Sequence, residues 1–317
     1  MSNQDNKTTQ NGAPRVKQKF GRMFLRFRQD TNILFELTRK GVKTQYRGSV
    51  LGMLWTVLNP LLNMAVMWVV FSSFFGSGDE TYAIYLLTGN ILFASLSAST
   101  NGALGSLVGN RGLLLRTKIN PHLFPISAVT TALVSLGFSF VALIVIMLGV
   151  QLGSPNNLEL FGVQMLLILA MLPAFLLFES GVGLFLSAVY VYGRDIRHFY
   201  SVFLTLWMYL TPIFWQSNIL IRNTEGVIEK TIAMKVVECN PMYYFLQYFR
   251  EAVYYTHCKG QSIWILTIKE TGEKVWLAPA ILRNVPMLLW LYILGVVTCV
   301  VGAGLFCIMK KRFATHL

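Results

Sequence analysis

Charged residues are scarce in this sequence of 317 residues: Asp, Glu, Lys and Arg together make up 13% of it. An average soluble domain contains about 25% charged residues. Hydrophobic residues account for 54% of the chain. This composition excludes an ordinary soluble protein and predicts an integral membrane protein.

Sequence motifs for catalysis and metal binding are also absent. The chain contains no G-x-x-x-x-G-K-[ST] sequence, so it does not bind ATP through a P-loop, and it contains neither H-E-x-x-H nor a nucleophile elbow. The four histidines are scattered and form no ligand cluster. We therefore expect no catalytic residue, no metal site and no cofactor on this chain.

Ionisable residues are nearly missing from the long apolar runs, which argues against a proton-relay or ion-coupled pump. The exception is Glu179. A charged side chain at the centre of a membrane helix costs about 2.5–3.5 kcal/mol, so we expect this residue to face the bundle interior or a cavity. Two interpretations stay open: Glu179 lines a polar path, or its carboxyl group joins two helices by a hydrogen bond.

Six apolar runs are candidates for membrane-spanning helices, because about 20 apolar residues at ~1.5 Å each cross a hydrocarbon core of ~30 Å. The first contains Pro60, which predicts a kink. The predicted spans are residues 51–75, 82–108, 123–150, 162–191, 199–216 and 284–309.

The distribution of positive charge predicts the orientation of these spans. The formal net charge is +13, and eleven of the 27 Lys and Arg residues lie in residues 1–50. The two short loops predicted on the outer side, 76–81 and 151–161, contain no Lys or Arg. Basic loops stay in the cytoplasm, so we expect both termini on the cytoplasmic side of the membrane. Attraction to anionic lipids explains the net charge better than nucleic acid does.

Two segments outside the spans have distinct patterns. Residues 1–14 are polar and predict a disordered cytoplasmic tail, whereas 15–47 carry apolar residues at helical spacing with Lys and Arg between them. The latter pattern predicts an amphipathic helix on the inner leaflet, or one packed on a partner protein. Residues 48–317 then form the transmembrane domain. Within it, 239–256 are too apolar for a loop and too short to span, which predicts a re-entrant helical hairpin on the outer side between spans 5 and 6. The predicted fold is all-α.

The stretch RKGVKTQYRGSVLGMLWTVLNPLL, residues 39–62, resembles the signature of ABC-2 type permease subunits that export lipid-linked polysaccharides such as O-antigen, capsule and teichoic acid. Three later stretches agree with this resemblance: RGLLLRTKINPHLFP (111–125), YGRDIRHFY with TPIFW (192–215), and NPMYYFLQYFR (240–250). Together they cover nearly the whole chain from about residue 30.

The resemblance implies a function, a set of partners, and a location in a bacterial or archaeal cytoplasmic membrane. Two copies of this chain would form a translocation path, with two separate P-loop ATPase subunits carrying the ATP and Mg²⁺. The substrate would be a glycan or a teichoic-acid-like polymer on a polyprenyl diphosphate, moved to the outer face of the membrane. The segment around 111–120 would be the coupling helix that docks on the ATPase.

The candidate site residues fall into four groups. Those for the lipid phosphate are Arg39, Lys40, Lys43 and Arg47, although the positive-inside rule alone also explains them. Those for the translocation path are Trp55, Asn59, Glu179, Tyr209, Tyr243 and Tyr244; the aromatic members would stack on sugars, or else form interfacial belts. Those for ATPase coupling are Arg111, Leu114, Arg116 and Lys118, and Arg194 and Asp195 form an inner-loop motif.

Two other functions agree less well with the sequence. An ABC-2 exporter of drugs or small lipids belongs to the same class, but the signature at 39–62 argues against it. A polyprenyl-phosphate-dependent membrane glycosyltransferase would need catalytic carboxylates or an acidic metal-binding motif in a loop, and no such set is present.

Overall fold

The structure is a computed structural model that describes residues 14–45, 47–52, 54–75, 82–117, 119–153, 165–215, 221–224, 227–230, 232–254, 265–267, 274–276, 285–310 and 313. The helices are α1 (Pro14–Gln45), α2 (Leu54–Phe75), α3 (Tyr82–Gly109), α4 (Arg111–Arg116), α5 (Leu123–Gly153), α6 (Leu166–Tyr192), α7 (Ile196–Leu210), α8 (Ile232–Glu238), α9 (Pro241–Tyr254) and α10 (Val285–Lys310). The strands are β1 (Ile221–Thr224), β2 (Val227–Lys230), β3 (Ile265–Thr267) and β4 (Lys274–Trp276).

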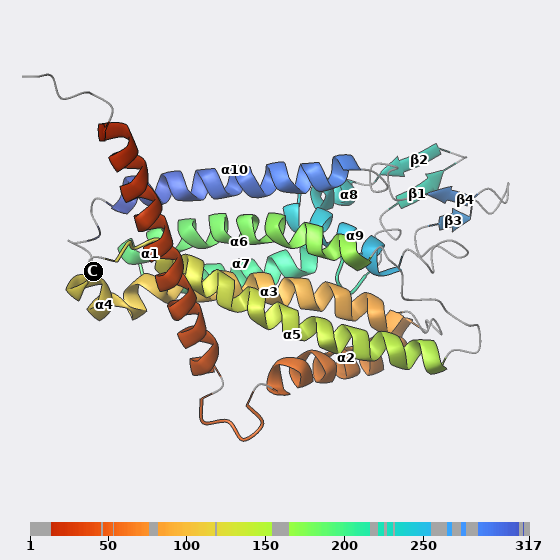
Figure 1. Ribbon diagram of the computed structural model, residues 1–317. Helices are drawn as coiled ribbons and strands as arrows, with labels where there is room; N and C mark the ends of the chain where they lie inside the picture. Colours follow the sequence, from red (N-terminus) through yellow and green to blue (C-terminus); the bar gives the residue numbers. More distant parts are fainter. Residues whose placement is uncertain are drawn as a thin grey trace, which may run out of the picture.

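Long apolar helices run side by side along the molecule, and α1 crosses them at one end (Figure 1). In the described part of the chain, four stretches are long and apolar enough to cross a membrane: Ile84–Gly109, Leu123–Leu152, Leu166–Tyr192 and Met287–Lys310. The described apolar stretch of α2, Leu54–Met67, is shorter, and α7 has 15 residues. Six helices therefore occupy the six predicted positions, while the count of six membrane spans stays a prediction.

The closest helix packing joins α6 and α10. A Cβ atom added to Gly181 would clash with the backbone carbonyl of Thr298, and one added to Gly302 would clash with the backbone of Gly181. Backbones approach this closely only where side chains are missing, which is how small residues hold membrane helices together. Of the other helices, α3, α5 and α9 pack against α6, whereas α1 packs against α5.

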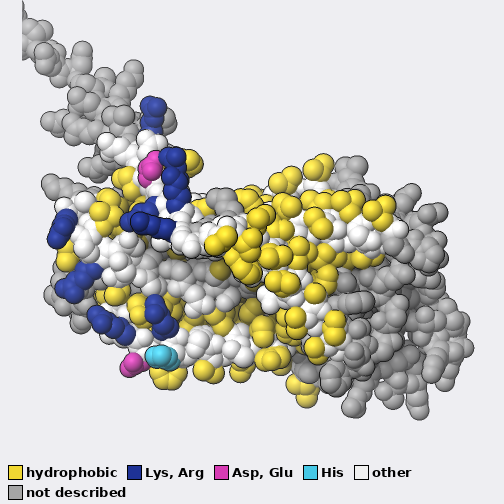
Figure 2. All heavy atoms as spheres, turned by 90° about the horizontal axis from the view of Figure 1, so that it is seen from below, with side chains coloured by type: hydrophobic (Ala, Val, Ile, Leu, Met, Phe, Trp, Pro, Cys, Tyr) yellow, Lys and Arg dark blue, Asp and Glu magenta, His cyan; other side chains and the backbone are white. Residues whose placement is uncertain are grey.

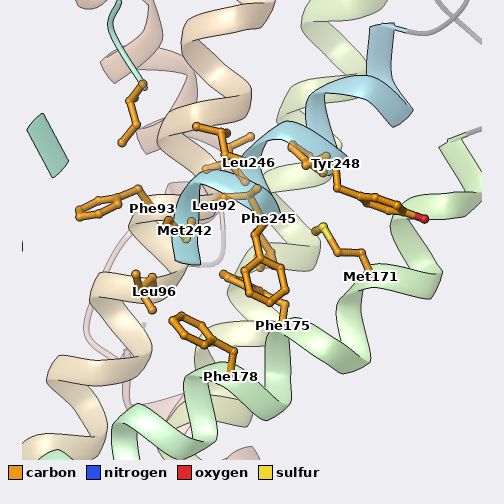
Figure 3. Close-up of a cluster of buried hydrophobic side chains, with 14 of the residues drawn as sticks. Leu92, Phe93, Leu96, Met171, Phe175, Phe178, Met242, Phe245, Leu246 and Tyr248 are labelled. Atoms are coloured by element: carbon orange, nitrogen blue, oxygen red, sulfur yellow. The ribbon is translucent and has the colours of Figure 1, made fainter. Parts of the chain in front are cut away.

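The main core lies where α9 meets α3 and α6 (Figure 3). The ring of Phe245 on α9 lies 5.2 Å from that of Phe175 and 5.3 Å from that of Phe178, both on α6. Leu92 and Leu96 of α3 complete the same cluster. The helix α9 is therefore a packed part of the bundle.

A second buried cluster, the inner core, lies at the opposite end of the bundle from α9. Its buried members are Leu107, Phe124, Leu184, Ala188, Val191, Phe306 and Phe313. Leu37 of α1, Leu114 of α4 and Ile119 pack against it. The inner core therefore connects α1 and α4 to the ends of α3, α5, α6 and α10.

The structure corrects two details of the sequence prediction. The fifth predicted helix, 199–216, ends at Leu210, because Thr211 precedes Pro212 and takes an extended conformation (φ −85°, ψ 132°). Proline disfavours the helical conformation in the residue before it. In addition, two antiparallel hairpins, β1–β2 and β3–β4, interrupt the otherwise helical fold near α8 and α9 (Figure 1).

The structure describes only part of two other predicted segments. The predicted amphipathic segment forms α1, a single helix of 32 residues that Pro14 begins. Residues 1–13 of the predicted tail lie outside the described residues. In the predicted hairpin 239–256 the structure describes one helix, α9, which follows α8 directly, so re-entry into the membrane stays a prediction.

Charged and apolar side chains occupy different parts of the surface. Lys and Arg gather at the end of the bundle where α1 and α4 lie, and an apolar surface extends along the helices away from that end (Figure 2). Large apolar side chains such as Val145 on α5, Leu206 on α7 and Val300 on α10 are more than half exposed. An apolar surface of this extent is typical of lipid contact.

Candidate functional site

The four basic residues predicted as lipid-phosphate ligands lie together. Arg39, Lys40, Lys43 and Arg47 line an open groove of about 590 Å³ with Glu36 and Thr44, and this set is called the basic groove below. Lys40, Lys43 and Arg47 are three and four residues apart, and Arg39 lies four residues before Lys43. This spacing places them along one face of the C-terminal part of α1 and the turn after it. The four cations therefore lie together, and their role in binding a lipid phosphate stays a prediction.

The basic groove carries a net positive charge. Its one carboxylate, on Glu36, lies 4.0 Å from Nη1 of Arg39, and both side chains are more than half exposed. Such surface ion pairs are worth ~0–1 kcal/mol, so Glu36 neutralises little of the charge. Guanidinium and ammonium groups at this spacing can bind an anion with two or more negative oxygens, such as a diphosphate.

Two glycines shape the turn that follows the basic groove. Gly48 has φ of +83° and Gly52 has φ of +50°, and a Cβ atom at either position would meet no neighbour within 4 Å. These positive φ values favour glycine over other residues for conformational reasons alone. The turn brings the chain from α1 into α2, whose described polar residues Trp55 and Asn59 are exposed.

The other face of α1 contacts the bundle. The amide Nδ2 of Asn120 donates hydrogen bonds to both carboxylate oxygens of Asp30, at 2.9 and 3.0 Å. Further along α1, a Cβ atom at Gly41 would lie 2.7 Å from Oγ1 of Thr131 on α5, which shows a close helix approach. The groove residues lie on a different face of α1, so the bundle contacts α1 without covering the basic groove.

His122 lies in the same junction, just before α5. Burial lowers the pKa of His122 from its ordinary value of 6.5, and the Asp30 carboxylate partly offsets this by favouring the charged imidazolium. The neutral imidazole is therefore the favoured form at neutral pH.

The short helix α4 projects at the end of the bundle (Figure 1). It has no buried residue; Leu115 is 60% exposed, and Arg111 and Arg116 are exposed. Leu114 alone turns toward the inner core. An exposed leucine between two arginines is a suitable contact for a partner protein. Lys118, the fourth coupling candidate, lies outside the described residues.

Arg194 and Asp195 form the turn between α6 and α7, and both are exposed. The backbone carbonyl of Asp195 accepts a hydrogen bond from the His198 amide at 2.9 Å. The next arginine, Arg197, lies over the ring of Tyr190, 5.3 Å from its centroid. The motif therefore joins two helices at the same end of the bundle as α4.

The path candidates do not gather at one place. Trp55 and Asn59 are exposed on α2, and Tyr209 is 63% exposed on α7. Tyr243 is buried and Tyr244 is half-buried, and the two rings contact each other on α9, with centroids 5.4 Å apart.

Glu179, the last path candidate, is fully buried between α6 and α3. Its Oε1 accepts a hydrogen bond from Oγ of Ser95 at 3.2 Å. Within the described residues no cation contacts this carboxyl group. The arrangement matches the second of the two sequence interpretations, a hydrogen bond between two helices.

Sequence reasoning missed a polar cluster around the extended segment after α7. Arg250 of α9 is 1% exposed, and its guanidinium donates to the carbonyls of Pro212 at 2.7 Å, Tyr85 at 3.2 Å and Ile213 at 3.3 Å. It also lies 3.6 Å from the ring centroid of Tyr85. The signal in the sequence was a lone arginine in the apolar stretch NPMYYFLQYFR.

Asn240 holds the same segment from the other side. Its Oδ1 accepts hydrogen bonds from Nε1 of Trp207 at 2.7 Å and from the Met242 amide at 3.0 Å, and its Nδ2 donates to Oγ1 of Thr211 at 2.8 Å. Asn240 therefore caps α9 and joins it to the end of α7. Together, Arg250 and Asn240 fasten α9 to the bundle.

Within the described residues, no group of three or more His, Cys, Asp or Glu side chains is arranged to hold a metal ion. Cys239, Cys299 and Cys307 are free thiols, and Cys258 lies outside the described residues.

Comparison with known proteins identifies related sequences. The family model described as ABC-2 type transporter matches residues 33–254. An O-antigen export system permease protein RfbA of Myxococcus xanthus is 26% identical over 72% of this chain and 82% of its own length. Two proteins of the same description from Klebsiella pneumoniae are similar: one is 26% identical over 62% of this chain and 76% of its own length, the other 24% identical over 93% of this chain and all of its own length.

Proposed function

Because the chain belongs to the ABC-2 type transporter family, we propose that it is the permease subunit of an exporter that moves a polyprenyl-diphosphate-linked polysaccharide outward across the cytoplasmic membrane. The chain is a multi-pass membrane protein and a transporter subunit rather than an enzyme. The observation that carries the proposal is the similarity to O-antigen export permeases, one of which matches over its full length.

ATP hydrolysis takes place on a partner in this proposal, because the chain has no P-loop. Two ATPase subunits dock on α4 in a homodimer of this chain, through the exposed Leu115 and the flanking Arg111 and Arg116. Both termini of each copy then face the ATPases. The basic groove and the Arg194–Asp195 turn lie at the same end of the bundle as α4.

In this proposal the basic groove receives the diphosphate of the lipid carrier at the inner leaflet. Its four cations and one weakly paired carboxylate provide the charge, and its open shape leaves room for a bulky headgroup. The aromatic and polar side chains of the path candidates then contact sugars of the glycan. The lipid provides the recognised anion, so glycans of different sequence can share the same permease.

The test uses proteoliposomes that contain this chain and the P-loop ATPase that co-purifies with it. We expect ATP-dependent movement of a polyprenyl-diphosphate-linked glycan across the bilayer, and loss of this movement when the ATPase is omitted. Export by this chain alone would contradict the proposal. Movement of a drug or a short-chain lipid, without movement of the glycan, would identify another ABC-2 exporter.

A second experiment tests the basic groove. Arg39→Gln and Arg47→Gln each remove one cation. A cation near an anionic surface contributes about 1 kcal/mol to binding, so we expect each variant to bind the lipid diphosphate about fivefold more weakly. Arg28→Gln is the matched control, because Arg28 is exposed on the same helix outside the groove. Equal binding by all three variants would leave only an orienting role for the groove cations.

A further inference from the structure

The helix α1 has two faces with different contacts. One face carries the basic groove, and the other contacts the bundle through Asp30, Leu37 and Gly41. Asp30 lies ten residues before Lys40, which corresponds to about 15 Å along a helix. A force applied at Asp30 therefore acts on the groove through a continuous helix.

The partner of Asp30 belongs to the segment that follows α4. This helix ends at Arg116, Asn120 follows four residues later, and α5 begins at Leu123. Leu114 of α4 and Ile119 pack on the inner core, against which Leu37 of α1 also packs. The structure thus connects α4 to α1 twice, through shared apolar packing and through the Asn120–Asp30 hydrogen bonds.

The two connections differ in how precisely they fix the position of α1 relative to α4. Apolar contacts are non-directional, so they specify the relative position of two helices less precisely than a hydrogen bond does. A carboxylate that accepts two hydrogen bonds from one amide has a defined position, and hydrogen bonds to charged groups are about twice as strong as neutral ones. The pair is partly buried, which protects it from competition with water.

We propose that Asp30 and Asn120 are the positioning residues that transmit displacement of α4 to α1, and thereby couple events at α4 to the position of the basic groove. This inference rests on the proposed function, in which an ATPase docks on α4 and a lipid diphosphate binds in the groove. Neither residue belongs to α4 or to the lining of the basic groove, so each acts through the other.

The experiment reverses the pair. Asn120→Asp places two carboxylates opposite each other, and the double variant Asp30→Asn with Asn120→Asp restores one amide and one carboxylate in exchanged positions. Asn32→Asp is the matched control, because it adds the same charge to an exposed position of α1. Glycan export and ATP hydrolysis are measured in the same proteoliposomes, with the partner ATPase present.

We expect Asn120→Asp to lower the number of glycans exported per ATP about tenfold, equivalent to about 1.4 kcal/mol. ATP hydrolysis itself stays near the wild-type rate, because the docking surface on α4 is unchanged. The double variant restores export per ATP, and Asn32→Asp matches the wild type. A purely structural role would instead lower export and hydrolysis together, in proportion to the amount of folded protein.

Two results would overturn the proposed coupling through Asp30 and Asn120. The first is a wild-type number of glycans exported per ATP by Asn120→Asp, and the second is a reduced number that the double variant does not restore. If Asn120→Asp does not reach the membrane, Asn120→Ala replaces it: reduced export per ATP supports the link, and an unchanged ratio overturns it. A wild-type protein that exports no glycan with its ATPase contradicts the proposed function itself, whereas failure of the link alone leaves wild-type export intact.

Discussion

Replacing Arg250 by methionine tests how α9 is held in the bundle. The guanidinium is 1% exposed and donates to three carbonyls. Two of these carbonyls keep another donor after the substitution. The Tyr85 carbonyl accepts from Oγ1 of Thr88 at 2.9 Å, and the Pro212 carbonyl, at 3.1 Å, shares the Tyr85 hydroxyl proton with the Trp215 carbonyl at 2.7 Å. The carbonyl of Ile213 keeps no other donor among the described contacts.

The expected cost follows from these contacts. One buried carbonyl without a donor costs about 1–3 kcal/mol. Loss of the desolvated contact between the guanidinium and the Tyr85 ring costs about 2 kcal/mol more. Methionine is uncharged, so the substitution also removes the desolvation cost of the buried guanidinium, and this gain offsets part of the loss. We therefore expect Arg250→Met to lower the free energy of unfolding by about 3 kcal/mol, roughly a hundredfold change in the ratio of folded to unfolded protein.

The assay is reversible unfolding of the purified protein in mixed micelles with increasing amounts of dodecyl sulfate, followed by tryptophan fluorescence. Arg28→Met is the control, because an exposed substitution of this kind changes stability by less than about 0.5 kcal/mol. If Arg250→Met unfolds at the same amount of dodecyl sulfate as the wild type, the expected loss of stability is refuted. It would mean that the desolvation of the buried charge cancels its hydrogen bonds, as occurs for some buried ion pairs.

Three further predictions follow from the described contacts. Glu179→Gln keeps the hydrogen bond from α3 without the charge, so export at the wild-type rate is expected, and a loss of export would indicate a charge-dependent role. Gly181→Leu drives a side chain into the backbone of α10 at Thr298, so it should prevent folding, as measured by the amount of monodisperse protein after detergent extraction. Because burial lowers the pKa of His122, the unfolded chain binds the proton more tightly; stability should therefore fall as pH drops below about 6.5, and less so in His122→Gln, in unfolding titrations at pH 7 and pH 5.

The helices and the proximity of the four groove cations follow from local sequence patterns. Long apolar runs predict helices because a backbone in lipid must satisfy its hydrogen bonds within each segment. The four groove cations lie within nine residues of one another, so helical periodicity alone places them on one face. The end of α7 at Leu210 also has a local cause in the sequence, because Pro212 disfavours a helical conformation at Thr211.

The contacts between distant segments were not predictable in this way. Asp30 and Asn120 are 90 residues apart, and Arg250 contacts a carbonyl of Tyr85 across 165 residues. Such pairs depend on which helices are neighbours and on their rotation about their axes, which a composition or a period does not specify. Glu179 shows the same contrast. The sequence alone places it in an apolar helix without other charges, whereas only the packing of α3 on α6 shows that Ser95 is its hydrogen-bond partner. Periodicity acts over a few turns of one helix, whereas packing depends on shape complementarity between helices far apart along the chain.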